Sequence, residues 1–191
     1  LKEVRAQVKH RRHIENPILQ KSNEEIEQIH SEATLAQYLF EFQNVHVDVL
    51  TGLVVLDSGF VVDSTLAKWQ KVIYRGGIGS SVKRTKKSKG KITGCLMVLP
   101  HSPFYYHILI DELPNLIRIR DENPHCNGVI VHTTMPQWAL ELLSYFHFDI
   151  HKINERAVVA ENLLAVSAPR AIVGKHLENL RRQIETKPEK I

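Results

Sequence analysis

The chain has 191 residues, enough for one compact domain with a sizeable core. Hydrophobic residues make up 43% and charged residues 24%; no apolar run approaches the roughly 20 residues of a membrane-spanning helix, and two cysteines are too few for a disulfide framework. The formal net charge is +4, but six basic side chains between residues 83 and 91 exceed that total, which argues against a generally basic surface.

The first third of the chain changes from a helical to an alternating pattern. Residues 1–21 are charged and poor in periodic apolar positions, so we expect an irregular or partly helical lead-in. The tetrad Ser22-Asn23-Glu24-Glu25 fits a capping box, and the apolar spacing after it predicts a helix from about residue 23 to 42. Short apolar runs separated by turn residues then predict a small antiparallel meander, with strands at 45–49, 53–56 and 60–62.

Two less regular segments follow the meander. Residues 64–72 fit a short helix with Trp69 facing inward. Residues 75–91 combine a glycine-rich stretch with the basic run, and we expect a mobile surface loop there.

From residue 92 onward, apolar strand-like runs alternate with helical patterns. We expect strands at 92–99, 128–131, 148–153 and 163–166, and helices at 103–120, 135–145 and 174–185. Pro114 predicts a kink or break in the first of these helices. Thr133 or Thr134 is expected to cap the second, with Pro136 in its first turn. The alternation predicts an α/β fold with a Rossmann-like, doubly wound parallel sheet.

These patterns divide the chain into three parts. Residues 1–43 are interpreted as the lead-in and N-terminal helix, residues 44–172 as the Rossmann-like domain, and residues 173–191 as a C-terminal helix and tail.

The helix entry after the strand at 92–99 holds the strongest candidate site. His107 and Asp111 are four residues apart and share one helix face, while Glu112 is displaced by about 100° around the axis. A carboxylate that holds an imidazole in one tautomer makes it a better general base. The alternative is a His–Asp pair on the surface that only adds a little helix stability.

Other features support weaker hypotheses. The glycines after Arg75 could cradle a phosphate, and the basic run at 83–91 could meet an anionic surface, although flexible and solvated loops explain both. His132 follows a strand and so lies where α/β sheets bind ligands. Trp69 and Trp138 are interpreted as core residues. The histidines show no metal-binding spacing, so we expect no metal ion or other cofactor.

The segment from Phe104 to Leu116, FYYHILIDELPNL, resembles the tyrosine–histidine, acid–leucine–proline motif of the family 61 glycosyltransferases. The flanking segments occur in the family's order: the strand and acid-bearing turn at 60–64, the strand and helix at 128–143, and the strand at 161–169. The resemblance spans about residues 45–180. The helix motif is moderately specific, and the shared order strengthens it.

The resemblance implies a metal-independent, inverting enzyme of the two-domain GT-B type, of which this chain contains the first, acceptor-side domain. The family's nucleotide-contacting half is not visible after Pro169, so we expect an incomplete enzyme or further sequence elsewhere. His107 is the expected base, Asp111 its orienting partner and Glu112 a competing base. Expected substrate contacts come from Tyr105, Tyr106, His132 and Arg75.

The expected function is transfer of a sugar from a nucleotide-sugar donor to a carbohydrate or glycoconjugate hydroxyl in polysaccharide biosynthesis, as in capsule formation. The alternative is a non-catalytic module that binds a polyanion through its basic loop, and a second is another α/β enzyme that uses the glycine-rich loop for phosphate. No nucleic-acid partner is expected. The expected location is cytoplasmic, with peripheral membrane association as one variant, or the Golgi or ER lumen for a eukaryotic chain that has lost a targeting segment.

Overall fold

The computed structural model describes residues 8–14, 37–59, 61–62, 82–83, 85–88, 90–101, 105–166, 181–182 and 184–185. Three predictions lie outside these residues: the helix before residue 37, the short helix at 64–72, and the glycine-rich stretch with Arg75. The strands are β1 (Val8–Ile14), β2 (Gln37–Asp48), β3 (Leu53–Val55), β4 (Lys91–Val98), β5 (Gly128–His132), β6 (Asp149–Ile153) and β7 (Ala157–Val166). The helices are η3 (His107–Glu112), α5 (Leu113–Glu122) and α6 (Gln137–Tyr145).

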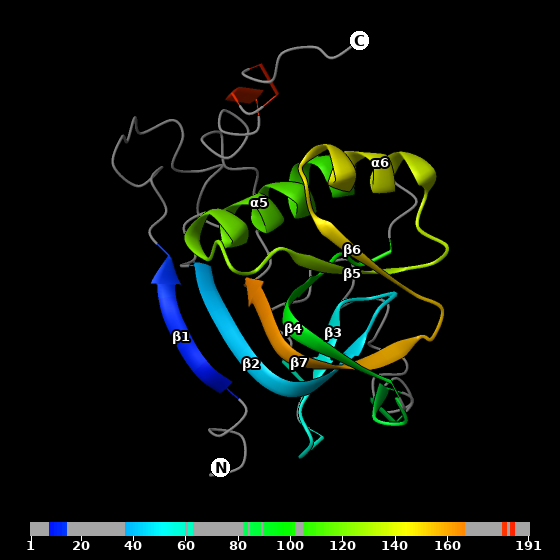
Figure 1. Ribbon diagram of the computed structural model, residues 1–191. Helices are drawn as coiled ribbons and strands as arrows, with labels where there is room; N and C mark the ends of the chain where they lie inside the picture. The colour runs from blue at the N-terminus through cyan, green and yellow to red at the C-terminus, as the bar shows by residue number, and fades with distance from the viewer. Residues whose placement is uncertain are drawn as a thin grey trace, which may run out of the picture.

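The strands form one seven-stranded mixed sheet in the order β1-β2-β7-β4-β5-β6, with β3 paired to β2 as well (Figure 1). Strands β7, β4, β5 and β6 pair in parallel, as the strand–helix alternation predicts. β2 is antiparallel to β7, to β1 and to β3. The α/β class is therefore confirmed, and the sheet is mixed: the parallel strands expected from the alternation stand beside the antiparallel strands β1, β2 and β3.

β4 joins two parts of the sheet because it bends near Gly94. Its register with β7 shifts between Ile92 and Cys95, and Gly94 has a φ of +99°. Pairs with β7 run from Lys91 to Leu96, whereas pairs with β5 begin only at Leu96. A bulge with a left-handed glycine bends a strand, and β4 visibly turns between its two partners (Figure 1).

The sheet separates two apolar clusters. Val129 and Val131 of β5 point into the cluster formed with η3, α5 and α6, while Ile130 points into the cluster lined mainly by β2 and β7. Alternate strand residues face opposite sides, so these are the two faces of the sheet. α5 and α6 lie next to each other on the same face (Figure 1).

Several sequence expectations need correction. Residues 37–42 belong to β2 and not to a helix: Phe40 and Phe42 are buried on one face, with Glu41 less buried between them. β2 therefore crosses residue 43, where we expected the boundary between the N-terminal part and the Rossmann-like domain. Residues 8–14 are strand β1, although the sequence predicts irregular or partly helical structure. The last strand, β7, is ten residues long and begins before residue 163.

The meander and the terminal helix are described in part. β2 and β3 are antiparallel neighbours, and an isolated antiparallel bridge joins Val55 to Val61, as the meander requires. Residues 181–182 and 184–185 are helical, within the helix expected at 174–185.

Candidate functional site

The candidate site is built from the segments that follow β4 and β5. These strands are parallel neighbours, so their carboxyl ends lie at one edge of the sheet. The helical segment after β4 includes Tyr105, and α6 follows β5 with Trp138 in its first turn. The rings of Tyr105 and Trp138 lie 4.9 Å apart between centroids. The two segments therefore meet directly.

The helix after β4 begins with a wide turn. Residues His107–Glu112 are π-helical, and the Leu113 N–H donates to the Ile108 carbonyl five residues before it. Pro114 has no N–H to continue an α-helical ladder, so the interruption predicted there takes the form of this wider turn. Single π-helical turns inside helices are rare and occur frequently at functional sites.

His107 and Asp111 form the pair that their spacing predicts. Their Nδ1 and Oδ2 atoms are 2.8 Å apart, and the side chains are 32% and 28% exposed. The ring of Tyr106 meets the His107 ring edge-on at 5.8 Å. A carboxylate hydrogen-bonded to one ring nitrogen fixes the tautomer and the orientation of the imidazole. The pair therefore has the arrangement of an oriented general base.

Glu112 faces a different environment. With Gly52, Pro100 and Asn115 it lines a small hollow of about 50 Å³, partly open to solvent, whose remaining wall is mostly apolar. Burial, and secondarily the nearby Asp111 charge, raise the pKa of Glu112 to about 7. The carboxyl is therefore poised to exchange a proton near neutral pH. His107 and Asp111 are not among the residues that line this hollow.

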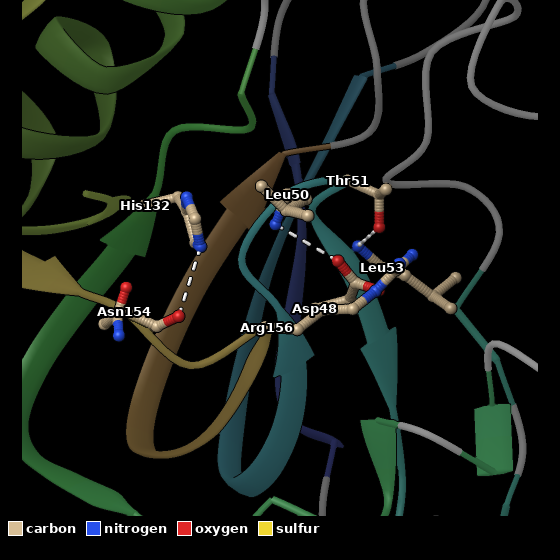
Figure 2. A network of polar contacts seen from close by, with 7 residues as sticks. All are labelled: Asp48, Leu50, Thr51, Leu53, His132, Asn154 and Arg156. Carbon is tan, nitrogen blue, oxygen red and sulfur yellow. Dashed lines mark hydrogen bonds and ion pairs between the residues drawn. The ribbon is translucent and has the colours of Figure 1, made fainter. Parts of the chain in front are cut away.

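His132 lies at the expected sheet edge but takes part in a network that joins loops (Figure 2). Its Nδ1 is 2.7 Å from the Thr134 hydroxyl, and its Nε2 is 3.3 Å from the Asn154 carbonyl oxygen. Thr133 donates to the Asn154 side chain at 3.2 Å. His101, after β4, has a lowered pKa because of burial and the charge of His132. These contacts position the turn between β5 and α6.

The helix start after β5 differs from its prediction. Pro136 itself is the N-cap of α6, and no side chain caps the helix, so the expected caps from Thr133 or Thr134 are wrong. The two threonines instead bond to Asn154 and His132, as described above.

The structure describes most, but not all, of the other side chains that we expected to contact a substrate or an anionic surface. Tyr105 and Tyr106 are exposed, at 57% and 53%. Arg75 lies outside the described residues. Of the basic run, Lys83, Lys86, Lys87 and Lys91 are exposed, and Lys91 pairs with Glu161.

Trp138 was expected in the core, and the structure places it at the surface of the core, beside the candidate site. Trp138 packs against the helix-side cluster but is only partly buried, and it extends that cluster to the exposed Tyr105. Its place just after a strand's carboxyl end is the signal that could have identified it.

In the part of the chain that the structure describes, no group of three or more His, Cys, Asp or Glu side chains could hold a metal ion. Among the same residues, no helix has the length and apolar character needed to cross a membrane. Comparison of the chain with protein-family models, curated proteins and solved structures finds no match.

Proposed function

We propose that this chain is the Rossmann-like, acceptor-side part of an inverting glycosyltransferase of the GT-B type. The observation that carries the proposal is the 2.8 Å contact between His107 and Asp111 at the carboxyl edge of β4. The resemblance of the surrounding motif to the family 61 glycosyltransferases supports it. The substrates are a nucleotide-sugar donor and the hydroxyl of a carbohydrate or glycoconjugate, in polysaccharide biosynthesis.

In the proposed reaction the acceptor hydroxyl gives its proton to His107 as its oxygen attacks the anomeric carbon of the donor. The new carbon–oxygen bond forms while the bond to the diphosphate breaks, so the configuration inverts and a nucleoside diphosphate leaves. Asp111 holds the imidazole in one tautomer and stabilises the imidazolium that results. Glu112 is the competing base, because a carboxyl with a pKa of about 7 also accepts a proton near neutral pH.

The test is a transfer assay on the complete enzyme that contains this part, with UDP-glucose, UDP-N-acetylglucosamine and UDP-xylose as donors and oligosaccharides as acceptors. We expect His107→Ala to lower kcat by about 10²- to 10⁴-fold, the range of a general base, with little change in Tm. His125→Ala is the matched control, because His125 is exposed and lies outside the site. Unchanged turnover in His107→Ala together with a large loss in Glu112→Gln would assign the base to Glu112.

The alternative is a non-catalytic module that binds a polyanion through residues 83–91, and the exposure of Lys83, Lys86 and Lys87 favours it specifically. It predicts salt-sensitive binding to heparin, a loss of that binding when the three lysines are changed to glutamine, and no transfer by any variant.

A further inference from the structure

We infer that Tyr105 and Trp138 form a stacking subsite for one pyranose ring of a neutral carbohydrate, with Tyr105 on the same helical segment as the His107–Asp111 pair. This inference deepens the proposed function and rests on it for the role of the bound sugar as acceptor. The binding itself is measurable without any transfer reaction.

Aromatic surface is unusually exposed at this edge of the sheet. Large hydrophobic side chains exposed in the described part of the chain are Tyr105, Tyr106, Tyr145 and Ile184, and the two most exposed are adjacent in sequence and next to His107. Exposed apolar patches of this kind mark binding surfaces.

The exposed ring of Tyr105 is held in place. It packs against Trp138 with a centroid distance of 4.9 Å and an interplanar angle of 50°. Trp138 in turn packs against the core cluster of α5 and α6. A rigid aromatic surface loses little conformational entropy on binding, which favours it as a recognition element.

The side chains around the two rings favour a neutral ligand. Residues 105–117 and 128–151, which carry the two rings, contain no Lys or Arg, whereas phosphate, nucleic acid and anionic lipid are bound through such cations. The next cations along the Tyr105 helix, Arg118 and Arg120, pair with acidic side chains of α5. Neutral hydrogen-bonding side chains precede Trp138, namely Thr133, Thr134 and Gln137. An aromatic face carries partial negative charge and attracts the polarised C–H groups of a pyranose face, while the hydroxyls of the sugar bind polar neighbours.

The experiment measures binding of cellohexaose, chitohexaose and xylohexaose to the 191-residue protein by ligand-observed NMR and calorimetry, without donor. We expect at least one probe to bind, and Tyr105→Leu to weaken that binding by about five- to tenfold, the scale of one aromatic contact. Tyr105→Phe retains the ring and should bind within about twofold of the wild type. Tyr145→Leu is the control, because it removes a ring that is 41% exposed at the far end of α6.

The inference fails if none of the three probes binds, or if Tyr105→Leu binds as tightly as Tyr105→Phe. Binding of phosphatidylcholine or phosphatidylserine vesicles that disappears in Tyr105→Leu, with no glycan binding, would make the surface a membrane contact and also overturn it. The two proposals fail separately. Glycan binding without transfer leaves the subsite standing and removes the enzyme, whereas transfer with an unchanged acceptor KM in Tyr105→Leu does the reverse.

Discussion

Arg156 donates its Nε–H to the buried carboxylate of Asp48 at 2.9 Å, where β2 and β7 lie side by side (Figure 2). Asp48 is completely buried, and its other oxygen accepts the Leu50 N–H at 3.1 Å, whereas the Arg156 side chain is 40% exposed. Removing one partner of a buried ion pair leaves an uncompensated charge.

We therefore expect Arg156→Ala to lower the free energy of unfolding by about 2 kcal/mol, less than for a fully buried pair because water reaches the arginine. Urea denaturation measures the change. The double variant Asp48→Asn, Arg156→Ala should recover part of the loss, because it leaves no unpaired carboxylate. A loss for Arg156→Ala within the error of the fit would mean that the pair adds nothing to stability.

Gly94 permits the bend in β4. Its φ is +99°, and a Cβ placed there would meet no atom within 4 Å, so a substitution is opposed by backbone strain alone. We expect Gly94→Ala to destabilise the fold by about 2 kcal/mol. Gly90→Ala is the matched control, since Gly90 has equally open surroundings and no positive φ. Equal stability of the two variants in urea would show that the bend does not depend on glycine.

The Glu112 carboxyl should make stability depend on pH. Its pKa rises from 4.5 to about 7 on folding, so the folded protein holds the proton more tightly than the unfolded chain. The stabilisation is complete below pH 4.5 and is lost as the pH rises through 7, with a total of about 3 kcal/mol. Urea unfolding between pH 4 and 8 measures this slope.

Glu112→Gln should flatten that slope and be more stable than the wild type at pH 8. Glu155→Gln, at an exposed position, should leave the slope as it is. A wild-type slope that survives in Glu112→Gln would assign the pH dependence to another group.

The strands that could be predicted are those whose signal is local. β4, β5 and β6 begin or end within one residue of their expected bounds, because each is an apolar run between turn residues. The start of β2 is predicted as helix because its apolar residues fit both the helical and the strand period. Pairing with β1 and β7 makes this segment a strand. β1 is mostly polar, so its backbone pairing with β2 leaves no hydrophobic pattern to read.

The candidate site also contains one part that the sequence predicts and one part that it does not. The contact between His107 and Asp111 follows from a spacing of four residues on one helix, which sequence shows directly. The hollow around Glu112 needs Gly52 close to Pro100, so close that a Cβ on Gly52 would lie 2.8 Å from the proline ring. Contacts between distant segments depend on the bent sheet, and no local pattern encodes them.

The two cysteines should react very differently. Cys126 is buried, and its thiol donates a hydrogen bond to Cys95, which is only partly buried. That bond lowers the pKa of Cys95 and raises the pKa of Cys126. Because the thiolate is the nucleophile, iodoacetamide should modify Cys95 first in the native protein. Mass spectrometry should show this rate falling several-fold in Cys126→Ala; an unchanged rate would mean that the hydrogen bond does not activate Cys95.

His46 of β2 connects the basic segment, residues 83–91, to the sheet through hydrogen bonds. Its Nδ1 is 2.8 Å from the Ser88 hydroxyl and its Nε2 is 3.0 Å from the Asp57 carboxylate, while Lys86 donates to the Asp57 carbonyl at 2.5 Å. The Lys86 and Ser88 amides donate to carbonyls within the same segment. Without the imidazole, this short segment loses its side-chain contact with β2.

We expect His46→Ala to speed hydrogen exchange at the Lys86 and Ser88 amides by about fivefold, since a lost hydrogen bond contributes about 1 kcal/mol to closing such a segment. Exchange in β5 should stay the same, because the change is local. His125→Ala serves again as the exposed control. If both amides kept their protection in His46→Ala, the segment would be held by its own backbone. The exposure of Lys83, Lys86 and Lys87 would then not depend on His46.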